Sequence, residues 1–372
     1  MIMRFVHQET TVNHFATDLD RTYIMTIEEE MGHTLFGGSE NWSYEKGLTS
    51  PINDEAVEVF TSFVPFEEDY ITSNNIQYKT KLIATDSNFF KILPYPMLYG
   101  SNLTDTPNET ILTSEFAIKL FGNDDPIGKT ITLSTGDILR VIGVIGDPLS
   151  KSFLEFDLIV NQKLQPMGWR RMKQTLVMLN KSNNVDRINK IHSSFFELSA
   201  FRNNIRFQLT PLKDFYFESS IINLSPILIQ GNRDSLMVML IVSLLTLFVG
   251  IFNFINIYSV INMKREREFG IKKIYGASLS QLASQFLFEN LILVLVAIFC
   301  AWFFTEVSST ILAERLSFAV KPNLQFDIWL SISIIVILSI VVSVYPFIRY
   351  TKSSPITSLR SVNVSGVSVA SR

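Results

Sequence analysis

The feature that most constrains this chain is a run of 29 residues, 235–263, without a charged side chain. A helix needs about 20 apolar residues to cross the hydrocarbon core of a bilayer, and runs this long are rare in soluble cores. A second run, 328–348, has 21 uncharged residues, and a segment between the two runs carries one acid, Glu289, but is otherwise apolar. We therefore expect three membrane-spanning helices, over about 235–260, 282–305 and 328–349.

Residues 1–230 differ, because charges occur throughout and Gly, Pro, Asn and Asp separate short β-rich runs. In the segment ITLSTGDILRVIGVIGDP at 131–148, ITL and RVIGVI predict two strands joined by a Ser-Thr-Gly-Asp turn. Helical patterning is present at 114–121 and around 186–200. These patterns predict a globular α+β domain.

The basic residues predict the orientation, since Lys and Arg collect in short loops on the cytoplasmic side. Arg233 is the only Lys or Arg in the 20 residues before the first span. Five basic residues follow that span: Lys264, Arg265, Arg267, Lys272 and Lys273. We therefore expect 264–281 and the C-terminus in the cytoplasm, and 306–326 outside it. The fold class is then an α+β extracytoplasmic domain (1–230) followed by an all-α transmembrane helix bundle (231–360) and a cytoplasmic tail (361–372).

The first 25 residues contain no apolar core of a signal peptide, although the large domain that follows must cross the membrane. We expect a fourth, N-terminal membrane helix to precede Met1 in the natural gene product. The sequence is then a truncated product or half of a longer one.

Several classes of function have no residues to support them. The net charge is −3 and 18% of residues are charged, so no basic field exists for nucleic acid. The single cysteine allows no internal disulfide or thiolate zinc site, and the four histidines lack metal-ligand spacing. The segment GNDDPIGKT at 122–130 resembles a phosphate-binding loop, but it has one residue too many between its glycines and precedes a predicted strand. We expect a turn there, and no catalytic residues, metal site or cofactor in the chain.

The segment 264–281, KREREFGIKKIYGASLSQ, is charged but patterned, with an apolar face opposite a basic one. Gly276 ends the helical pattern, and Ser278 with Gln281 fits a capping box that starts the next helix. One interpretation is a basic anchor on lipid headgroups. The other is a docking helix that inserts into a groove of a cytoplasmic partner.

Several of these motifs resemble those of FtsX-like permeases. The run KREREFGIKKIYGAS followed by QFLFENLILVL resembles the family signature, as do NFINIYS at 253–259 and YPFIRYTKSSPITSLR at 345–360. The N-terminal part resembles a MacB-like periplasmic core, through DSNFFKILPYPMLYGSNL at 86–103, ILTSEFAIKLFGNDDPIGKTITL at 111–133, RVIGVIGDP at 140–148 and LTPLKDFYF at 209–217.

The resemblance implies a non-enzymatic permease subunit of an ABC exporter in the bacterial inner membrane, with ATP hydrolysed on a separate ABC ATPase. It implies export of antimicrobial peptides, macrolides or lipoproteins; the alternative is a non-transporting signalling regulator of an envelope hydrolase or a peptide sensor. Further expected partners are a second permease unit (homodimer, heterodimer or tandem repeat), a periplasmic adaptor and an outer-membrane channel. The residues expected to dock the ATPase are Lys264, Arg265, Glu266, Arg267, Glu268, Phe269, Gly270, Ile271, Lys272, Lys273 and Gly276.

Three polar residues inside the predicted spans are candidates for helix packing or coupling: Asn253, Asn256 and Glu289. Buried polar side chains in membrane helices typically hydrogen-bond to a neighbouring helix, with a contribution of about 0.6 kcal/mol. An ionised carboxylate in a span is costly unless it is paired or close to the interface. We favour packing over transport chemistry for the two asparagines.

Overall fold

The computed structural model describes residues 1–30, 34–36, 51–73, 75–104, 106–164, 173–197, 204–222, 227–316 and 322–352. The chain divides into two compact units, one formed by Met1–Gln8 with Asp234–Arg372 and the other by Glu9–Arg233. We call these the helical unit and the outer domain. Residues 1–8 group with the long helices, which Arg4 and His7 contact.

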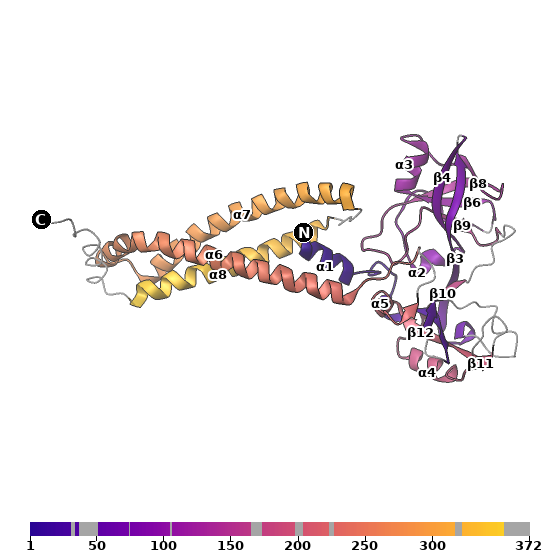
Figure 1. The fold of residues 1–372 in the computed structure, drawn as a ribbon, viewed down its shortest axis with the longest axis horizontal. Helices are drawn as coiled ribbons and strands as arrows, with labels where there is room; N and C mark the ends of the chain where they lie inside the picture. Colours follow the sequence, from indigo (N-terminus) through magenta and orange to yellow (C-terminus); the bar gives the residue numbers. More distant parts are fainter. Residues whose placement is uncertain are drawn as a thin grey trace, which may run out of the picture. The chain divides into compact units, whose positions relative to one another are not determined.

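The outer domain is built on a mixed sheet, of which the described residues form 13 strands (Figure 1). Its strands are β1 (Thr22–Glu29), β2 (Thr34–Phe36), β3 (Val57–Ser73), β4 (Ile76–Thr85), β5 (Met97–Gly100), β6 (Glu109–Thr113), β7 (Thr130–Leu133), β8 (Ile138–Ile145), β9 (Leu158–Asn161), β10 (Gln174–Leu179), β11 (Phe196–Glu197), β12 (Asn204–Pro211) and β13 (Ile221–Ile222). Their order is β11-β12-β1-β10-β3-β4-β9-β6-β8-β5, with β2 beside β1, β13 beside β2, and β7 beside β3 and β8. Strand β5 therefore lies at one end of this order.

Short helices accompany the sheet, and three long helices follow it. They are α1 (Ile2–Thr10), α2 (Phe89–Ile92), α3 (Ser114–Phe121), α4 (Asn184–Ile191), α5 (Leu212–Phe215), α6 (Arg233–Ile274), α7 (Leu279–Leu316) and α8 (Leu324–Lys352). The predicted helix at 114–121 and the predicted strands of 131–145 are confirmed. The predicted helix at 186–200 is too long, because α4 ends at Ile191 and Phe196–Glu197 form a strand; residues 198–200 lie outside the described ranges.

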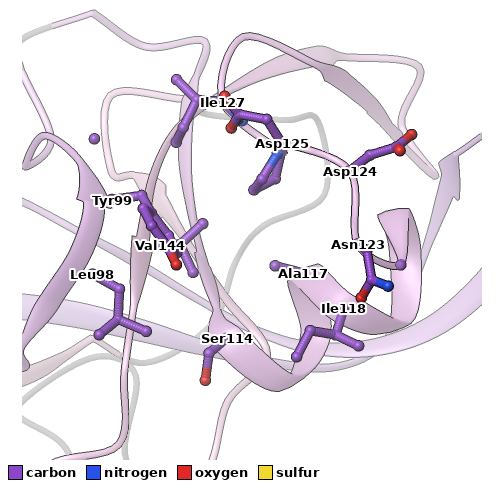
Figure 2. A pocket seen from close by; sticks show the side chains of 13 residues that line it. Leu98, Tyr99, Ser114, Ala117, Ile118, Asn123, Asp124, Asp125, Ile127 and Val144 are labelled. Atoms are coloured by element: carbon purple, nitrogen blue, oxygen red, sulfur yellow. Dashed lines mark hydrogen bonds between the residues drawn. The ribbon is translucent and has the colours of Figure 1, made fainter.

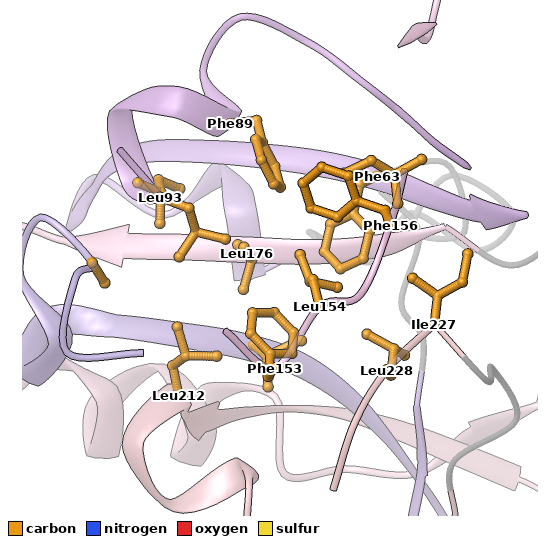
Figure 3. Packing of buried hydrophobic residues seen from close by; sticks show 14 of the residues in the cluster. Phe63, Phe89, Leu93, Phe153, Leu154, Phe156, Leu176, Leu212, Ile227 and Leu228 are labelled. Carbon is orange, nitrogen blue, oxygen red and sulfur yellow. The ribbon is translucent and has the colours of Figure 1, made fainter. Parts of the chain in front are cut away.

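An aromatic cluster fills the main core of the outer domain (Figure 3). The ring of Phe153 lies 6.5 Å from that of Phe63 and 5.8 Å from that of Phe215, both in edge-to-face geometry, and all three side chains are fully buried. Edge-to-face pairs align the positive ring edge with the negative face of the neighbour, which adds to the stabilisation from burial. This packing joins β3 to α5 and to the segment before β9.

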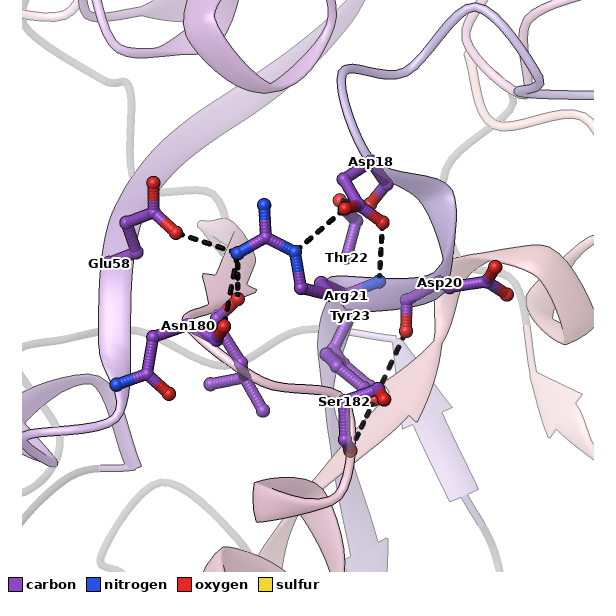
Figure 4. A network of polar contacts seen from close by, with 9 residues as sticks. Asp18, Asp20, Arg21, Thr22, Tyr23, Glu58, Asn180 and Ser182 are labelled. Carbon is purple, nitrogen blue, oxygen red and sulfur yellow. Dashed lines mark hydrogen bonds and ion pairs between the residues drawn. The ribbon is translucent and has the colours of Figure 1, made fainter.

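Arg21 links three parts of the outer domain (Figure 4). Its Nε donates to Asp18 at 2.7 Å, and its Nη1 donates to Glu58 at 2.8 Å and to the carbonyl oxygen of Leu179 at 3.0 Å. The hydrogen bond from Arg21 lowers the pKa of the Asp18 carboxyl. These contacts fix the start of β1 against β3 and the end of β10.

Glu9 forms a second, more buried polar cluster. Its carboxylate accepts a hydrogen bond from Lys151 at 2.5 Å and another from the Tyr216 hydroxyl. Burial, together with the neighbouring Glu9 carboxylate, raises the pKa of Tyr216. Asn13, with a φ of 65°, accepts a hydrogen bond from the Phe153 N–H at 3.0 Å. The segment after α1 is thereby fixed to residues 151–153.

His192 makes the stability of the outer domain depend on pH. Burial lowers the pKa of this imidazole, an effect that the nearby Asp54 carboxylate only partly opposes. Below about pH 6.5 the unfolded chain therefore binds more protons at this site than the folded chain, so stability is full above that pH and falls as the pH decreases. Between pH 7 and 5 we therefore expect the melting temperature to fall through this group. Circular dichroism should show a smaller decrease for His192→Gln; an equal decrease would contradict the assignment.

Among the described residues, three helical segments are long and apolar enough to cross a membrane: Arg233–Tyr258 within α6, Leu279–Ser309 within α7, and Leu324–Val344 within α8. An apolar helix is thus present at each of the three predicted spans. The helices meet in a small cluster of Tyr258, Leu282, Phe286 and Val342. Elsewhere they bury little of one another, with 0%, 17% and 22% of the three most apolar windows buried, in chain order.

Candidate partner-docking site

The segment that follows the first span continues the same helix. We expected a short helix here that ends near Gly276, and the structure has α6 running without interruption for 42 residues, from Arg233 to Ile274. The helix is continuous with the first span because high charge ends an apolar pattern without ending a helix, and Lys, Arg and Glu are good helix formers. For Lys264, Arg265, Glu266, Arg267, Phe269 and Gly270, the structure describes the helical backbone alone.

The turn between α6 and α7 has the form that the sequence predicts. Gly276 has a φ of +89°, and its N–H donates to the carbonyl of Lys273 while the N–H of Ala277 donates to that of Lys272. This pair of bonds is a Schellman motif, which requires a left-handed residue. Ser278 and Gln281 then form the capping box, with reciprocal bonds of 2.9 and 3.3 Å. The two helices thus form a closed hairpin, which we call the α6–α7 hairpin.

A chain of polar contacts crosses this hairpin. The Lys272 ammonium donates to Glu268 at 2.8 Å on its own helix and to Gln285 at 3.0 Å on α7. The Gln285 amide donates in turn to Glu289 at 2.8 Å. Three of the predicted site residues are therefore brought together by Gln285, which the sequence analysis missed. The available signal was its position four residues before Glu289, one helical turn away.

The end of the hairpin presents apolar side chains. Tyr275 is 88% exposed, and Ile271, Ile274 and Leu279 are also exposed, while Leu282 packs inside. Lys273 lies beside them and is half-buried. Four of the five predicted apolar residues are thus exposed at the turn, and the Lys272 ammonium contacts Glu268 and Gln285.

A fully buried polar contact between the packed spans is made by a residue that we did not select. Asn253 and Asn256 are exposed on α6. Asn290 on α7 is fully buried, and its amide donates to the Ser343 hydroxyl of α8 at 2.8 Å. The sequence of α7 is apolar on nearly all sides of the helix, so no pattern in it indicates which side packs against α8.

Ion pairs of Arg4 connect α1 to α7 and α8. Arg4 is 8% exposed, and its Nε donates to Asp327 on α8 at 2.7 Å while its Nη2 donates to Glu306 on α7 at 2.9 Å. The ring of His7 stacks on Phe326 at 4.1 Å. None of these residues was a candidate from the sequence, because more than 300 positions separate the ion partners.

Two further polar features of the described residues are possible metal ligands and the segment that resembles a phosphate-binding loop. No group of three His, Cys, Asp or Glu side chains within the described ranges is placed to hold a metal ion. The GNDDPIGKT segment lies between the end of α3 at Phe121 and the start of β7 at Thr130, as a turn. That confirms the expectation of a turn in the outer domain.

Both parts of the chain match known protein families. Residues 1–192, just over half of the chain, match the MacB-like periplasmic core domain, and residues 240–355 match the FtsX-like permease C-terminal domain. The uncharacterized ABC transporter permease YknZ of Bacillus subtilis (strain 168) is 25% identical over 233 residues, which cover 62% of this chain and 52% of that relative. The chain thus spans about half the length of the relative that it matches.

Two solved structures are similar to the chain at low identity. The periplasmic region of MacB from Actinobacillus actinomycetemcomitans aligns at 14% identity and a TM-score of 0.34, over 50% of this chain and 88% of that structure. The extracellular domain of the noncanonic ABC-type transporter YknZ from Gram-positive bacteria aligns at 14% identity and a TM-score of 0.35, over 51% of this chain and 99% of that structure. On the two family matches, the chain belongs to the ABC transporter permeases that join a MacB-like periplasmic core domain to an FtsX-like permease domain.

Proposed function

We propose that this chain is the permease subunit of an exporter in the bacterial inner membrane, and that its α6–α7 hairpin docks on a separate ABC ATPase in the cytoplasm. The observation that carries the proposal is the exposed apolar turn of the hairpin, with Tyr275 88% exposed. The Schellman motif, the capping box and the Lys272–Gln285 contact hold this turn in one conformation. A preorganised apolar end with Lys273 beside it suits insertion into a partner's groove.

The length of α6 supports a mechanical function. A continuous helix of 42 residues is roughly 63 Å long. ATP bound and hydrolysed on the partner moves the hairpin, and the helix carries that displacement across the bilayer. The outer domain then moves or hands over a substrate, for which the expected classes are antimicrobial peptides, macrolides and lipoproteins. ATP is the only cofactor that this mechanism needs, and it binds to the partner.

The exposed spans support pairing with a second permease unit. None of the most apolar window of α6 is buried against the described helices. A tunnel or hand-over path needs more helices than these three, so we propose that a second unit covers part of this surface. A periplasmic adaptor and an outer-membrane channel complete the proposed exporter.

Co-purification tests the docking proposal. The affinity-tagged chain, extracted from native membranes in mild detergent, should retain an ABC ATPase polypeptide and its ATP hydrolysis. Tyr275→Asp and, separately, Lys273→Glu should each reduce the retained ATPase at least tenfold, because an interface anchor is typically worth 2 kcal/mol or more.

The matched control is Leu149→Asp, which adds the same charge at a side chain that is 98% exposed in the outer domain. It should retain the ATPase, and all variants should insert into the membrane equally. Retention by Tyr275→Asp at the level of Leu149→Asp would contradict the docking assignment.

A further inference from the structure

Two features of the described residues have no place in the proposed docking: a groove in the outer domain and a set of polar contacts between α7 and α8. Figure 2 shows the groove between β5, α3 and the turn that follows α3, with Tyr99 and Ile118 in its lining. No feature of its described residues indicates which molecule would bind there. The polar contacts between the helices, in contrast, follow a repeat that has a physical consequence.

Two hydrogen bonds between α7 and α8 share one alignment of the helices. The Asn290 amide of α7 donates to the Ser343 hydroxyl of α8 at 2.8 Å. Twelve positions further along α7, the Trp302 indole N–H donates at 2.9 Å to the Ser331 hydroxyl, which lies twelve positions back along α8. The two helices are therefore antiparallel in one constant alignment, which we call the resting register.

Each of the two serine acceptors has a second polar residue one turn before it on α8. Ser339 lies four positions before Ser343, and Asp327 lies four positions before Ser331. Residues four apart lie on the same face of a helix, about 6 Å apart along its axis. A shift of α8 by one turn along α7 can therefore replace both hydrogen bonds of the resting register at the same time.

The resting register leaves two buried polar atoms without a partner. Asn290 is fully buried and Ser339 is 6% exposed. The Asn290 Oδ1 and the Ser339 Oγ have no hydrogen-bond partner among the described residues, whereas the Ser343 hydroxyl also donates to the Ser339 carbonyl oxygen at 2.6 Å. Such atoms cost free energy between membrane helices, because no water replaces the missing bond. After the shift the Ser339 hydroxyl can donate to the Asn290 Oδ1, which satisfies both atoms.

The residues between these contacts do not oppose such a shift. On the same faces of the helices they are apolar: Val294 and Ile298 on α7, and Ile335 on α8. Contacts between apolar side chains have no fixed direction, so they select one alignment less strongly than hydrogen bonds do. The serines of α8 are small residues, which allow close approach of the two helices. The two alignments therefore differ mainly in their polar partners.

Arg4 of α1 holds the resting register. Its guanidinium bridges Glu306 of α7 and Asp327 of α8, at 2.9 and 2.7 Å. These two carboxylates continue the same alignment, four positions beyond Trp302 and Ser331. A one-turn shift moves the carboxylates apart by about 6 Å along the helix axis, so the guanidinium cannot keep both contacts.

We propose that α7 and α8 have a second register, shifted by one helical turn, and that the Arg4 bridge selects the resting one. In the second register the Ser339 hydroxyl bonds to Asn290. The Trp302 indole donates to the Asp327 carboxylate. One-turn shifts between two packed arrangements are a known way for proteins to change state, because packed helices are bistable rather than continuously deformable. The proposal concerns α1, α7 and α8, so it does not depend on ATPase docking at the α6–α7 hairpin.

Disulfide formation in the full chain, held in native membranes, tests the proposal. Cys300→Ser removes the native thiol. Ile298→Cys with Ile335→Cys reports the resting register, in which these two positions face each other. Val294→Cys with Ile335→Cys reports the second register. Copper phenanthroline is the oxidant, and mass spectrometry of proteolytic peptides measures the rate at which each disulfide forms. Both disulfides should form, the resting one faster.

Three variants distinguish a second register from loose packing. Ser339→Ala removes the new partner of Asn290 and should slow the second disulfide about threefold, as expected for one hydrogen bond between membrane helices, without slowing the resting one. The matched control Ser333→Ala makes the same change on the exposed side of α8 and should leave both rates unchanged. Arg4→Met should raise the rate of the second disulfide relative to the resting one about tenfold, because it removes a buried ion pair that only the resting register has.

The ratio of the two rates separates a change of register from a loss of packing, since helices that come apart form both disulfides more slowly. If Arg4→Met slows both, Arg4→Lys keeps the charge but reaches only one carboxylate, and it should still raise the ratio. The proposal is overturned if the second disulfide does not form in any of these variants. It is also overturned if Ser339→Ala and Ser333→Ala give equal rates, or if neither variant of Arg4 changes the ratio.

Discussion

Replacing Arg4 with methionine is expected to destabilise the helical unit by about 3–5 kcal/mol. Arg4 is 8% exposed and donates to Asp327 at 2.7 Å and to Glu306 at 2.9 Å. Methionine keeps much of the side-chain volume but leaves the buried Asp327 carboxylate without this partner. An unpaired carboxylate in that setting costs free energy because little water can reach it. The effect is measured by unfolding the detergent-solubilised chain with dodecyl sulfate while helicity is followed by circular dichroism.

Two further variants separate the lost ion pair from the lost arginine. Arg4→Met combined with Asp327→Asn removes the unpaired charge and should recover a large part of the stability. Lys129→Met breaks an ion pair of the outer domain whose Asp124 carboxylate is mostly exposed, and should cost about 0–1 kcal/mol. A cost for Arg4→Met no larger than that of Lys129→Met would show that the buried pair does not hold the helices together.

Replacing Phe153 with alanine is expected to destabilise the outer domain by about 3–5 kcal/mol. The side chain is fully buried between the rings of Phe63 and Phe215, at 6.5 and 5.8 Å. Alanine removes the ring from the centre of the cluster, and the rigid neighbours can close only part of the resulting cavity. We expect the melting temperature of the outer domain to fall by about 6–20 °C, as followed by near-ultraviolet circular dichroism.

Leu149→Ala is the matched control for this prediction, because Leu149 is four positions away and 98% exposed. It should change the melting temperature by less than about 2 °C, since exposed substitutions usually alter stability within about 0.5 kcal/mol. Phe153→Leu should fall between the two, because leucine refills part of the cavity. Equal melting temperatures for Phe153→Ala and Leu149→Ala would mean that the aromatic cluster is not the core of this domain.

The local sequence determines the membrane spans and the turn that follows the first one. Charge-free runs of 29 and 21 residues are long enough to cross a bilayer as helices and are typical of such spans. The structure has a helix at each run. Gly276 and the Ser278–Gln281 pair specify the end of one helix and the start of the next through bonds between near neighbours. The strands of 130–145 are likewise predicted by two short β-rich runs around a Ser-Thr-Gly-Asp turn.

The tertiary structure decides which polar residues pack between elements. Arg4 meets Glu306 and Asp327 across 302 and 323 positions, and Asn290 rather than Asn253 or Asn256 makes the buried contact between spans. It also decides that β5 lies at a sheet edge and that Ile118 faces a groove. The physical reason is range: hydropathy, capping and helical periodicity are set by residues within a few turns of one another. Burial and ion pairing depend instead on which distant segments come into contact, and that is established only when the chain folds.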